Sequence, residues 1–169
     1  MKNFLLLLVC LPLIGLAQKK VEPSTTIAIE GLVKQVQSFS IDDLKKYPVK
    51  KIGKLNIYSH DGTLKSTLKG LAGIPVKDLF QKVEFAVDSP KDLSQFLLVF
   101  EATDGYRVLY SWNEIFNTSV GDQVYVLTQA DGLTIDAMEQ RIAVVSMSDV
   151  RTGRRYVKSL SKIKVQRIN

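Results

Sequence analysis

The sequence is poor in the side chains that most often crosslink an exported protein or ligate a transition metal. Its 169 residues include a single cysteine, Cys10, and a single histidine, His60. One cysteine rules out a disulfide framework and a multi-cysteine zinc site, and one histidine rules out a histidine-rich metal cage. The chain also shows no Gly-rich phosphate loop, no local Ser-His-Asp signature, no internal repeat and no low-complexity tract. These absences leave few of the common catalytic chemistries open.

The N-terminal segment has the pattern of an export signal. Lys2 gives it a short positive start, residues 4–16 are largely apolar, and Gly15-Leu16-Ala17 supplies small residues at positions −3 and −1 of a cleavage site. We therefore predict a signal peptide over residues 1–17, a flexible N-terminus over residues 18–24, and a mature protein that is periplasmic or secreted. No later apolar run approaches the length of a membrane span, so none is expected.

Cys10 lies inside the apolar part of the predicted signal. A lipid anchor on this cysteine is the alternative, but Val9 is bulkier than the small residue that normally precedes a lipidated cysteine. After cleavage the mature chain would contain no thiol. Its stability would then come from packing rather than from crosslinks, and no thiolate could act as a nucleophile or a metal ligand.

Basic and acidic residues are distributed unevenly along the chain, whose formal net charge is +6. Residues 70–140 contain four basic and 11 acidic side chains, whereas seven basic side chains face one acidic side chain from residue 149 onward. Such segregation is typical of an ordinary solvated surface, or of a positive face for an anionic ligand. The basic stretches contain little aromatic interleaving, so nucleic acid is not an expected partner.

Alternation, turn and capping patterns predict an α+β domain over residues 25–169, with mostly antiparallel sheets and a few short helices. Ser40 can cap a short helix, and Asp61-Gly62 is typical of a hairpin turn. Pro75 fits the first turn of a second helix over residues 73–80. The expected strands cover residues 25–36 with a break at Gly31, 55–58, 63–68, 95–103, 106–112, 123–129, 141–146 and 156–168, with a further helical turn at 113–116.

Several of these segments resemble the molybdopterin-binding domain of sulfite-oxidase-type oxidoreductases. Residues 73–80 (GIPVKDLF) resemble the G-x-P-L-x-x-L-L helix start of that family, and residues 40–44 (SIDDL) resemble its s-l-x-d-L helix. Residues 101–107 (EATDGYR) resemble its D-G-Y hairpin, while residues 141–145 and 153–163 resemble its last strands. The resemblance implies the sulfite-oxidase-like fold, a compact α+β domain that holds the molybdenum cofactor in family enzymes.

Two departures from the family pattern bear on activity. In family enzymes a cysteine coordinates molybdenum shortly before the G-x-P-L helix, but the corresponding stretch here contains His60, Asp61 and Gly62. Ser146 also stands where the family has a proline. Imidazole and carboxylate are not equivalent to a soft thiolate as ligands. We therefore expect no metal ligation by cysteine and no sulfite oxidation by the family mechanism, although the resemblance still implies molybdopterin as a cofactor.

The resemblance also implies a basic ligand site. The family stretches that correspond to Arg141, Arg154, Arg155 and Lys158 help to hold the pterin and its phosphate, and guanidinium groups suit a dianion. Strand alternation would place Arg154 and Lys158 on one face and Arg155 on the other, partly covered. The alternative is an ordinary basic edge strand. His60 lies near the position of the missing ligand, so it is a candidate cofactor contact, acid–base group or ligand, or else an exposed hairpin residue.

Two aspartates and three aromatic residues are better explained by structural roles than by catalysis or binding. Asp61 and Asp104 each precede a glycine, which favours a role in turns rather than in catalysis. Tyr106, Tyr110 and Trp112 share the parity of one predicted strand. This spacing predicts one common face, in the core or on a sheet surface.

The leading hypothesis is an exported domain of sulfite-oxidase fold that binds a pterin or another small anionic ligand. We do not expect it to perform thiolate-dependent molybdenum redox chemistry. One alternative is an active molybdopterin-dependent oxidoreductase with a non-cysteine metal environment. A second alternative is a protein-interaction module whose acidic centre and basic flanks meet a protein partner.

Overall fold

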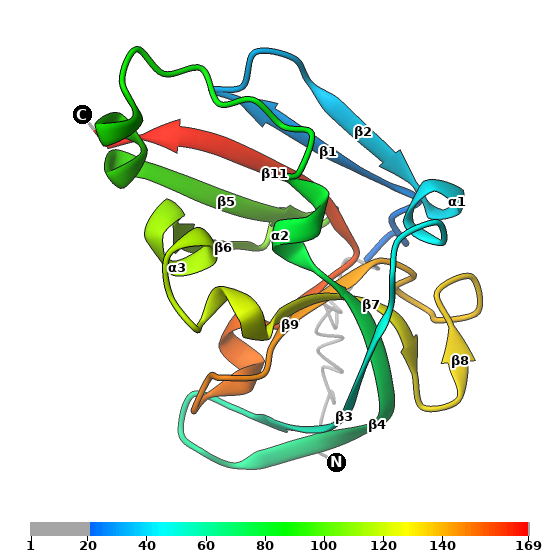
Figure 1. The fold of residues 1–169 in the computed structure, drawn as a ribbon. Helices are drawn as coiled ribbons and strands as arrows, with labels where there is room; N and C mark the ends of the chain where they lie inside the picture. The colour runs from blue at the N-terminus through cyan, green and yellow to red at the C-terminus, as the bar shows by residue number, and fades with distance from the viewer. Residues whose placement is uncertain (1–20, 169) are drawn as a thin grey trace, which may run out of the picture.

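The computed structural model describes residues 21–168, so the predicted signal peptide lies outside the described residues. Within them the chain forms eleven strands, three short α-helices and three 3₁₀ helices (Figure 1). The strands are β1 (Thr26–Gly31), β2 (Gln37–Ser40), β3 (Lys50–Tyr58), β4 (Leu64–Pro75), β5 (Phe96–Ala102), β6 (Arg107–Ser111), β7 (Val124–Ala130), β8 (Leu133–Thr134), β9 (Ala143–Ser146), β10 (Val157–Lys158) and β11 (Leu160–Arg167). The helices are α1 (Ile41–Leu44), α2 (Val76–Leu79), α3 (Trp112–Phe116), η1 (Pro90–Gln95), η2 (Gly121–Gln123) and η3 (Thr152–Arg155).

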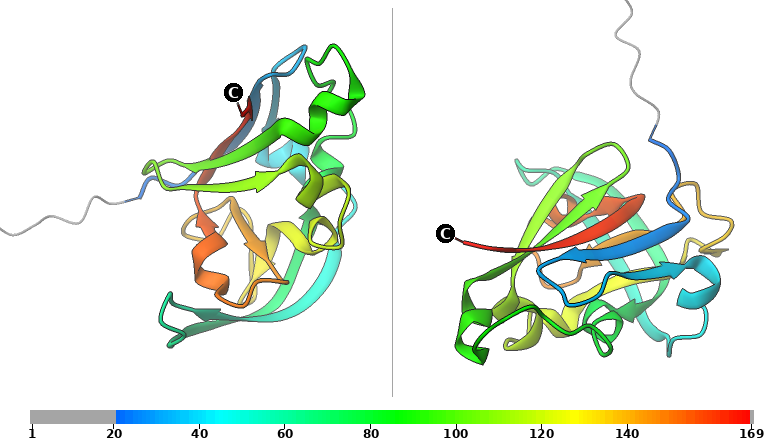
Figure 2. Two further views of the ribbon diagram at one scale, coloured as in Figure 1. Left: turned by 90° about the vertical axis from the view of Figure 1, so that its left-hand side faces the viewer. Right: turned by 90° about the horizontal axis from the view of Figure 1, so that it is seen from above.

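The strands form two sheets. The first sheet has the order β2-β1-β11-β5-β6, and the second has the order β10-β9-β7-β4-β3, with β8 paired to β7. Among the described strands only β1 and β11 pair in parallel. Figures 1 and 2 show the first sheet above the second, with the β3–β4 hairpin extending away from the first sheet. The predicted α+β class, with mostly antiparallel sheets and a few short helices, is confirmed.

The core lies between the two sheets because their strands alternate apolar and polar residues. Ile27 and Ile29 of β1 are fully buried, as are Leu98 and Phe100 of β5. The strands β7 and β9 of the second sheet are almost continuously buried, which is typical of strands covered on both faces. The protein therefore obtains its core from two layers of sheet, without a long helix. No helix among residues 21–168 is long and apolar enough to cross a membrane.

Local signals place two of the predicted elements correctly. The Ser40 hydroxyl accepts the Asp43 N–H at 3.2 Å while the Asp43 carboxylate accepts the Ser40 N–H at 3.1 Å, so α1 begins with a complete capping box. At the tip of the β3–β4 hairpin Gly62 has a φ of 90°, which glycine adopts without strain. The predicted capped helix and the predicted Asp61-Gly62 hairpin are both confirmed.

The second predicted helix begins later than expected. Gly73, Ile74 and Pro75 end strand β4 by pairing with β7, and α2 covers only Val76–Leu79. A Cβ at Gly73 would lie 2.6 Å from the carbonyl oxygen of Val126, so the glycine permits a close approach of the two strands. The predicted start at residue 73 is therefore wrong because tertiary pairing takes these three residues into the sheet.

The C-terminal basic stretch is not one continuous strand. Residues 152–155 form the 3₁₀ helix η3, β10 contains only Val157 and Lys158, and Ser159 has a φ of 54° before β11 begins. The strand predicted over residues 156–168 is thus broken. The predicted exposure is nevertheless confirmed, because Arg154 and Lys158 are exposed and Arg155 is partly buried, although η3 rather than a strand places the two arginines.

The packed domain begins at Ser24, one residue before the predicted boundary. Ser24 is 3% exposed and forms an isolated parallel bridge with Arg141. The Thr103 hydroxyl also donates to the Glu22 carbonyl oxygen at 2.6 Å. The part of the predicted flexible N-terminus that the structure describes is therefore attached to the domain at residues 22 and 24.

Candidate functional site

A groove of about 560 Å³ opens between the tip of the β3–β4 hairpin and η3. We call it the hairpin groove. Its lining combines hydroxyl, imidazole and cationic groups with one apolar side chain. The lining residues are Ile57, Tyr58, Ser59, His60, Lys65, Tyr106, Gly153 and Arg154. Two of the predicted site residues, His60 and Arg154, therefore meet in one groove, although they are far apart in the sequence.

A buried threonine attaches η3 to strand β3 and so shapes the groove. The Thr152 hydroxyl accepts the Tyr58 N–H at 3.0 Å and donates to the Asn56 carbonyl oxygen at 2.6 Å. The side chain thereby satisfies two backbone groups of an edge strand, as a neighbouring strand would. Next to it Gly153 lies so close to β3 that a Cβ would be 2.6 Å from the Tyr58 carbonyl oxygen. These contacts fix the wall that carries Arg154.

Tyr106 joins the groove from the turn between β5 and β6 of the first sheet. It is 44% exposed, and its hydroxyl donates to the Arg154 carbonyl oxygen at 2.5 Å. Tyr110, the fourth residue of β6, is fully buried instead. Trp112 begins helix α3, so the predicted common face of Tyr106, Tyr110 and Trp112 is wrong. The chain direction changes at α3, and Tyr106 precedes β6.

The hairpin groove carries positive charge without a neutralising carboxylate in its lining. Within residues 21–168, neither Lys65 nor Arg154 forms an ion pair. Arg151 adds a third cation beside the hairpin tip, since a Cβ at Gly62 would lie 2.9 Å from its Nη2. Like charges held close together in this way favour an anionic ligand.

The acidic residue nearest in sequence, Asp61, is occupied by its own turn. Its carboxylate accepts the Ser59 hydroxyl at 2.5 Å and the Thr63 N–H at 3.0 Å. The Ser59 hydroxyl, followed by the Thr63 N–H, lowers the pKa of Asp61 to about 2. Asp61 therefore stabilises the hairpin turn as a carboxylate, as predicted; it forms no ion pair with Lys65 or Arg154, although the charge of Lys65 also helps to lower the pKa of Asp61.

Arg155 lies in a different environment from its neighbour Arg154. Its guanidinium contacts Asp149 through two hydrogen bonds, Nε–Oδ2 at 2.8 Å and Nη2–Oδ1 at 2.5 Å, and contacts Glu114 through a third at 3.1 Å. It also lies over the Tyr110 ring, 4.2 Å from the centroid. We call these four residues the arginine cluster. The Asp149 hydrogen bonds are the first cause of a raised pKa for Arg155.

The arginine cluster holds Arg155 among its own partners, and Arg155 does not line the hairpin groove. The Arg155 side chain is 23% exposed and that of Asp149 only 11%, and both are turned toward each other. Glu114 also accepts the Ser111 N–H at 2.8 Å and so caps helix α3. Arg155 therefore joins η3 to α3 and to the loop after β9, which holds the groove wall in place.

Two further predicted ligand contacts lie outside the lining of the hairpin groove. Lys158 is exposed on β10, with its ammonium nitrogen 5.3 Å from the centroid of the Tyr156 ring. Arg141 has a φ of 56° and bridges Ser24 instead. The structure thus brings His60 and Arg154 together but does not bring Arg141 or Lys158 to them.

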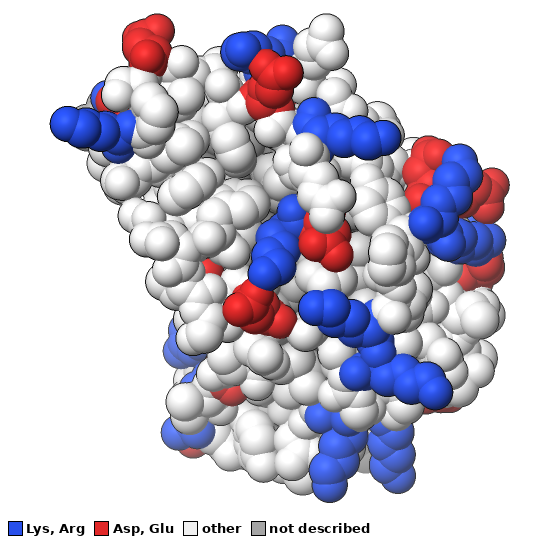
Figure 3. Space-filling view, viewed as in Figure 1, with Lys and Arg blue, Asp and Glu red and all other residues white. Residues whose placement is uncertain are grey.

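Sequence reasoning missed Lys65, Tyr58 and Arg151 as neighbours of the groove. The Asp61-Gly62 turn signal contained part of this information, because the hairpin pairs Tyr58 with Leu64 and so brings the next residue, Lys65, close to β3 at the register shift. The position of Arg151 beside Gly62 depends on the fold of distant segments. Figure 3 shows basic side chains with few acidic neighbours over the lower strands β3 and β4 on the face in view.

No group of three or more histidine, cysteine, aspartate or glutamate side chains within residues 21–168 is arranged to hold a metal ion. The single cysteine, Cys10, lies outside those residues. The cations and hydroxyls of the hairpin groove fit the phosphate and polar edge of a pterin ligand. A metal ion held by a protein thiolate has no cysteine among the described residues to bind it.

Fold and site together define a two-sheet α+β domain with an open basic groove. Among solved structures the chain is similar to the sulfane dehydrogenase SoxCD from Paracoccus pantotrophus, with a TM-score of 0.57 and 13% identity over 83% of this chain. The chain spans only 37% of the length of that SoxCD chain. No protein-family model matches the sequence, and none of the curated proteins does. The likeness therefore supports the fold alone.

Proposed function

We propose that this protein is an exported domain that binds a small anionic ligand, of the phosphate-bearing pterin type, in the hairpin groove. The observation that carries the proposal is the meeting of His60, Lys65 and Arg154 in a groove lined by no carboxylate. Arg154 supplies a planar donor and Lys65 a point charge, which together suit a phosphate group. Tyr58 and Tyr106 offer ring and hydroxyl surface to the rest of the ligand.

The cofactor class rests on two independent likenesses. The sequence resembles sulfite-oxidase-type molybdopterin-binding domains, and the fold is similar to a sulfane dehydrogenase. Molybdopterin, when bound, would supply the dithiolene that holds molybdenum. In this chain Arg154 and Lys65 would hold its phosphate, and His60 would contact its pterin or exchange a proton with it. The proposed role does not include thiolate-dependent redox chemistry.

Titration calorimetry with phenyl phosphate tests the anion site. We expect measurable binding by the purified protein, weakened about tenfold by Arg154→Ala and by a smaller factor by Lys65→Ala. The matched control is Lys54→Ala, which removes an exposed lysine from β3 outside the lining of the groove. Equal affinity in all three variants would mean that the anion binds elsewhere or not at all.

The competing function is an active molybdopterin-dependent oxidoreductase with a non-cysteine metal environment. The likeness to a dehydrogenase fold is the observation in its favour. Metal and pterin analysis of protein purified from its native host distinguishes the two. Stoichiometric molybdenum with a bound pterin would support the oxidoreductase, whereas a metal-free protein that still binds phenyl phosphate through Arg154 would support the proposal above.

A further inference from the structure

A second groove lies at the other end of the molecule, along strand β2. Segments 32–34 and 84–86 first run side by side, with hydrogen bonds from Lys34 N to Glu84 O at 2.8 Å and from Ala86 N to Leu32 O at 3.0 Å. Beyond Lys34 they separate, and no described backbone hydrogen bond joins residues 35–40 to residues 80–83. The separation leaves two adjoining cavities of about 230 Å³ and 530 Å³.

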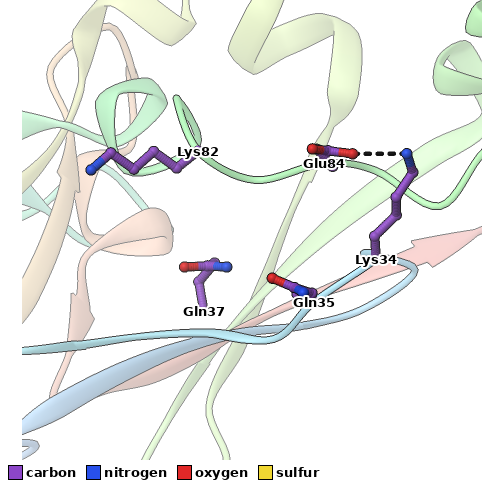
Figure 4. Close-up of a pocket in the computed structure, with 5 residues that line it drawn as sticks. All are labelled: Lys34, Gln35, Gln37, Lys82 and Glu84. Carbon is purple, nitrogen blue, oxygen red and sulfur yellow. Dashed lines mark ion pairs between the residues drawn. The ribbon is translucent and has the colours of Figure 1, made fainter.

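We call these adjoining cavities the β2 groove. Both are lined by Gln37 and Lys82, so they adjoin each other between β2 and the segment after α2. Figure 4 shows Gln35 and Gln37 rising from the lower segment toward the one that carries Lys82 and Glu84. Lys34 and Glu84, which form an ion pair at 2.8 Å, line the smaller cavity.

The backbone of β2 is open toward this groove. β2 is the terminal strand of the first sheet, and among the described strands it pairs only with β1. In an antiparallel pair each strand directs only every second residue's N–H and C=O toward its partner. The remaining N–H and C=O groups of β2 therefore point away from β1, and apart from the Ser40 N–H, which the Asp43 carboxylate already accepts at 3.1 Å, a further strand could pair with them.

The side chains of the groove divide into three kinds. Three amides, those of Gln35, Gln37 and Gln81, form no hydrogen bond within residues 21–168. Lys34 and Lys46 are paired with Glu84 and Asp43, each at 2.8 Å, whereas Lys82 forms no ion pair with a described residue. The far end is apolar, since Tyr47 packs edge-on against Phe39 at 6.1 Å beside Pro48.

We propose that the β2 groove binds an extended segment of a partner protein as an added strand on β2. The segment would carry an acidic side chain opposite Lys82, the one cation of the groove without a described carboxylate, and an apolar side chain against Tyr47. Main-chain hydrogen bonds to the sheet edge would supply affinity, and these two side-chain contacts would supply specificity. This inference does not depend on the hairpin groove or on its ligand.

A synthetic peptide tests the proposal directly. The probe is the acetylated and amidated peptide Thr-Val-Thr-Glu-Thr-Val-Thr, titrated into ¹⁵N-labelled protein and followed by amide chemical shifts. We expect the largest shifts at residues 35–40 and 80–84. The same peptide with alternate backbone nitrogens methylated should bind at least about tenfold more weakly, because it cannot donate to the β2 edge. A peptide with Gln in place of Glu should cause much smaller amide shifts in the wild-type protein, because it lacks the negative charge proposed to lie opposite Lys82.

Matched charge reversals locate the contact. Lys82→Glu should weaken peptide binding about tenfold, while Lys54→Glu, the same change outside this groove on β3, should alter it less than about twofold. Shifts confined to β3 or β6, equal effects of both reversals, or no shift at about 2 mM peptide would each overturn the proposal. So would concentration-dependent dimerisation that uses β2, because a second copy would then be the occupant.

Discussion

Arg154 and Arg155 are consecutive residues of η3, yet their side chains lie in opposite environments. Arg155 is largely buried and contacts two carboxylates and one aromatic ring. Arg154 is exposed, lines the hairpin groove, and has no carboxylate partner within residues 21–168. The same guanidinium group therefore serves the stability of the fold in one case and remains available for a ligand in the other.

The difference arises from what surrounds η3. Asp149 and Glu114 reach Arg155 from the loop after β9 and from α3, and Glu114 also caps α3. The groove side of η3 faces the β3–β4 hairpin, whose nearest carboxylate, Asp61, is occupied by its own turn. The ion pairs of Arg155 thus hold η3 in place, and η3 in turn positions Arg154, which has no described carboxylate partner. Substitutions at either arginine, or at the residues that hold η3, test this difference.

The largest expected effect belongs to Arg155→Ala. The substitution leaves Asp149, only 11% exposed, without its counter-ion, and it also removes the link from η3 to α3. Breaking a buried ion pair at one partner should lower the free energy of unfolding by about 3 kcal/mol. Urea denaturation followed by circular dichroism measures the change.

Arg154→Ala is the internal control for that experiment, since it removes the same side chain from the adjacent position. We expect it to change the free energy of unfolding by about 0.5 kcal/mol or less, as for an exposed residue without partners. Similar losses of unfolding free energy in both variants would show that the two arginines contribute equally to the fold. Arg154 could then not be distinguished from Arg155 as the residue available to a ligand.

Thr152→Val has the second-largest expected effect. It keeps the shape of a side chain that is 4% exposed but removes the hydroxyl that serves both Tyr58 N–H and Asn56 C=O. Leaving two backbone groups unpaired should cost about 2 kcal/mol of unfolding free energy. The control is Thr67→Val, because the Thr67 hydroxyl bonds only the Asn56 side chain on the more open hairpin.

Features set by residues close together in sequence were predictable, whereas features set by distant segments were not. The Ser40 cap and the Asp61-Gly62 hairpin depend on residues within a few positions of each other, and both are correct. The predicted exposure of Arg154 and partial burial of Arg155 are also correct, but the strand predicted to carry them is wrong, because η3 is fixed by Thr152 bonding to β3, 94 and 96 positions away in sequence.

The candidate site was predictable in part for the same reason. His60 and Arg154 each stood out as single residues, through rarity and charge, but their meeting depends on where η3 packs against the hairpin. The partners of Arg155 were equally invisible, since Glu114 lies 41 positions away and no local pattern links the two. Composition indicated which groups the protein could use, and only the fold decides which of them are free.

Lys65 and Lys158 test whether an anion is bound by residues close together in space or by residues of one basic stretch of sequence. Lys158 belongs to the same basic stretch as Arg154 but does not line the hairpin groove, whereas Lys65 does so from the hairpin. Lys65→Ala should therefore weaken phenyl phosphate binding several-fold, by less than about 1.4 kcal/mol, while Lys158→Ala leaves it within about twofold. Calorimetric titration gives both values. The reverse order would place the anion at β10 and contradict the proposed groove.

The smallest expected effect concerns the pH dependence of the hairpin turn. The pKa of Asp61 is lowered from 3.8 to about 2, mainly by the Ser59 hydroxyl, so the folded state binds this proton less readily than the unfolded state. The resulting stabilisation is present above about pH 4 and is lost as the pH falls toward 2. Asp61→Asn lacks this titration, so the difference in urea midpoint between wild type and variant should shrink over that interval. A constant difference between about pH 5 and pH 2 would show that the Asp61 carboxylate does not stabilise the turn.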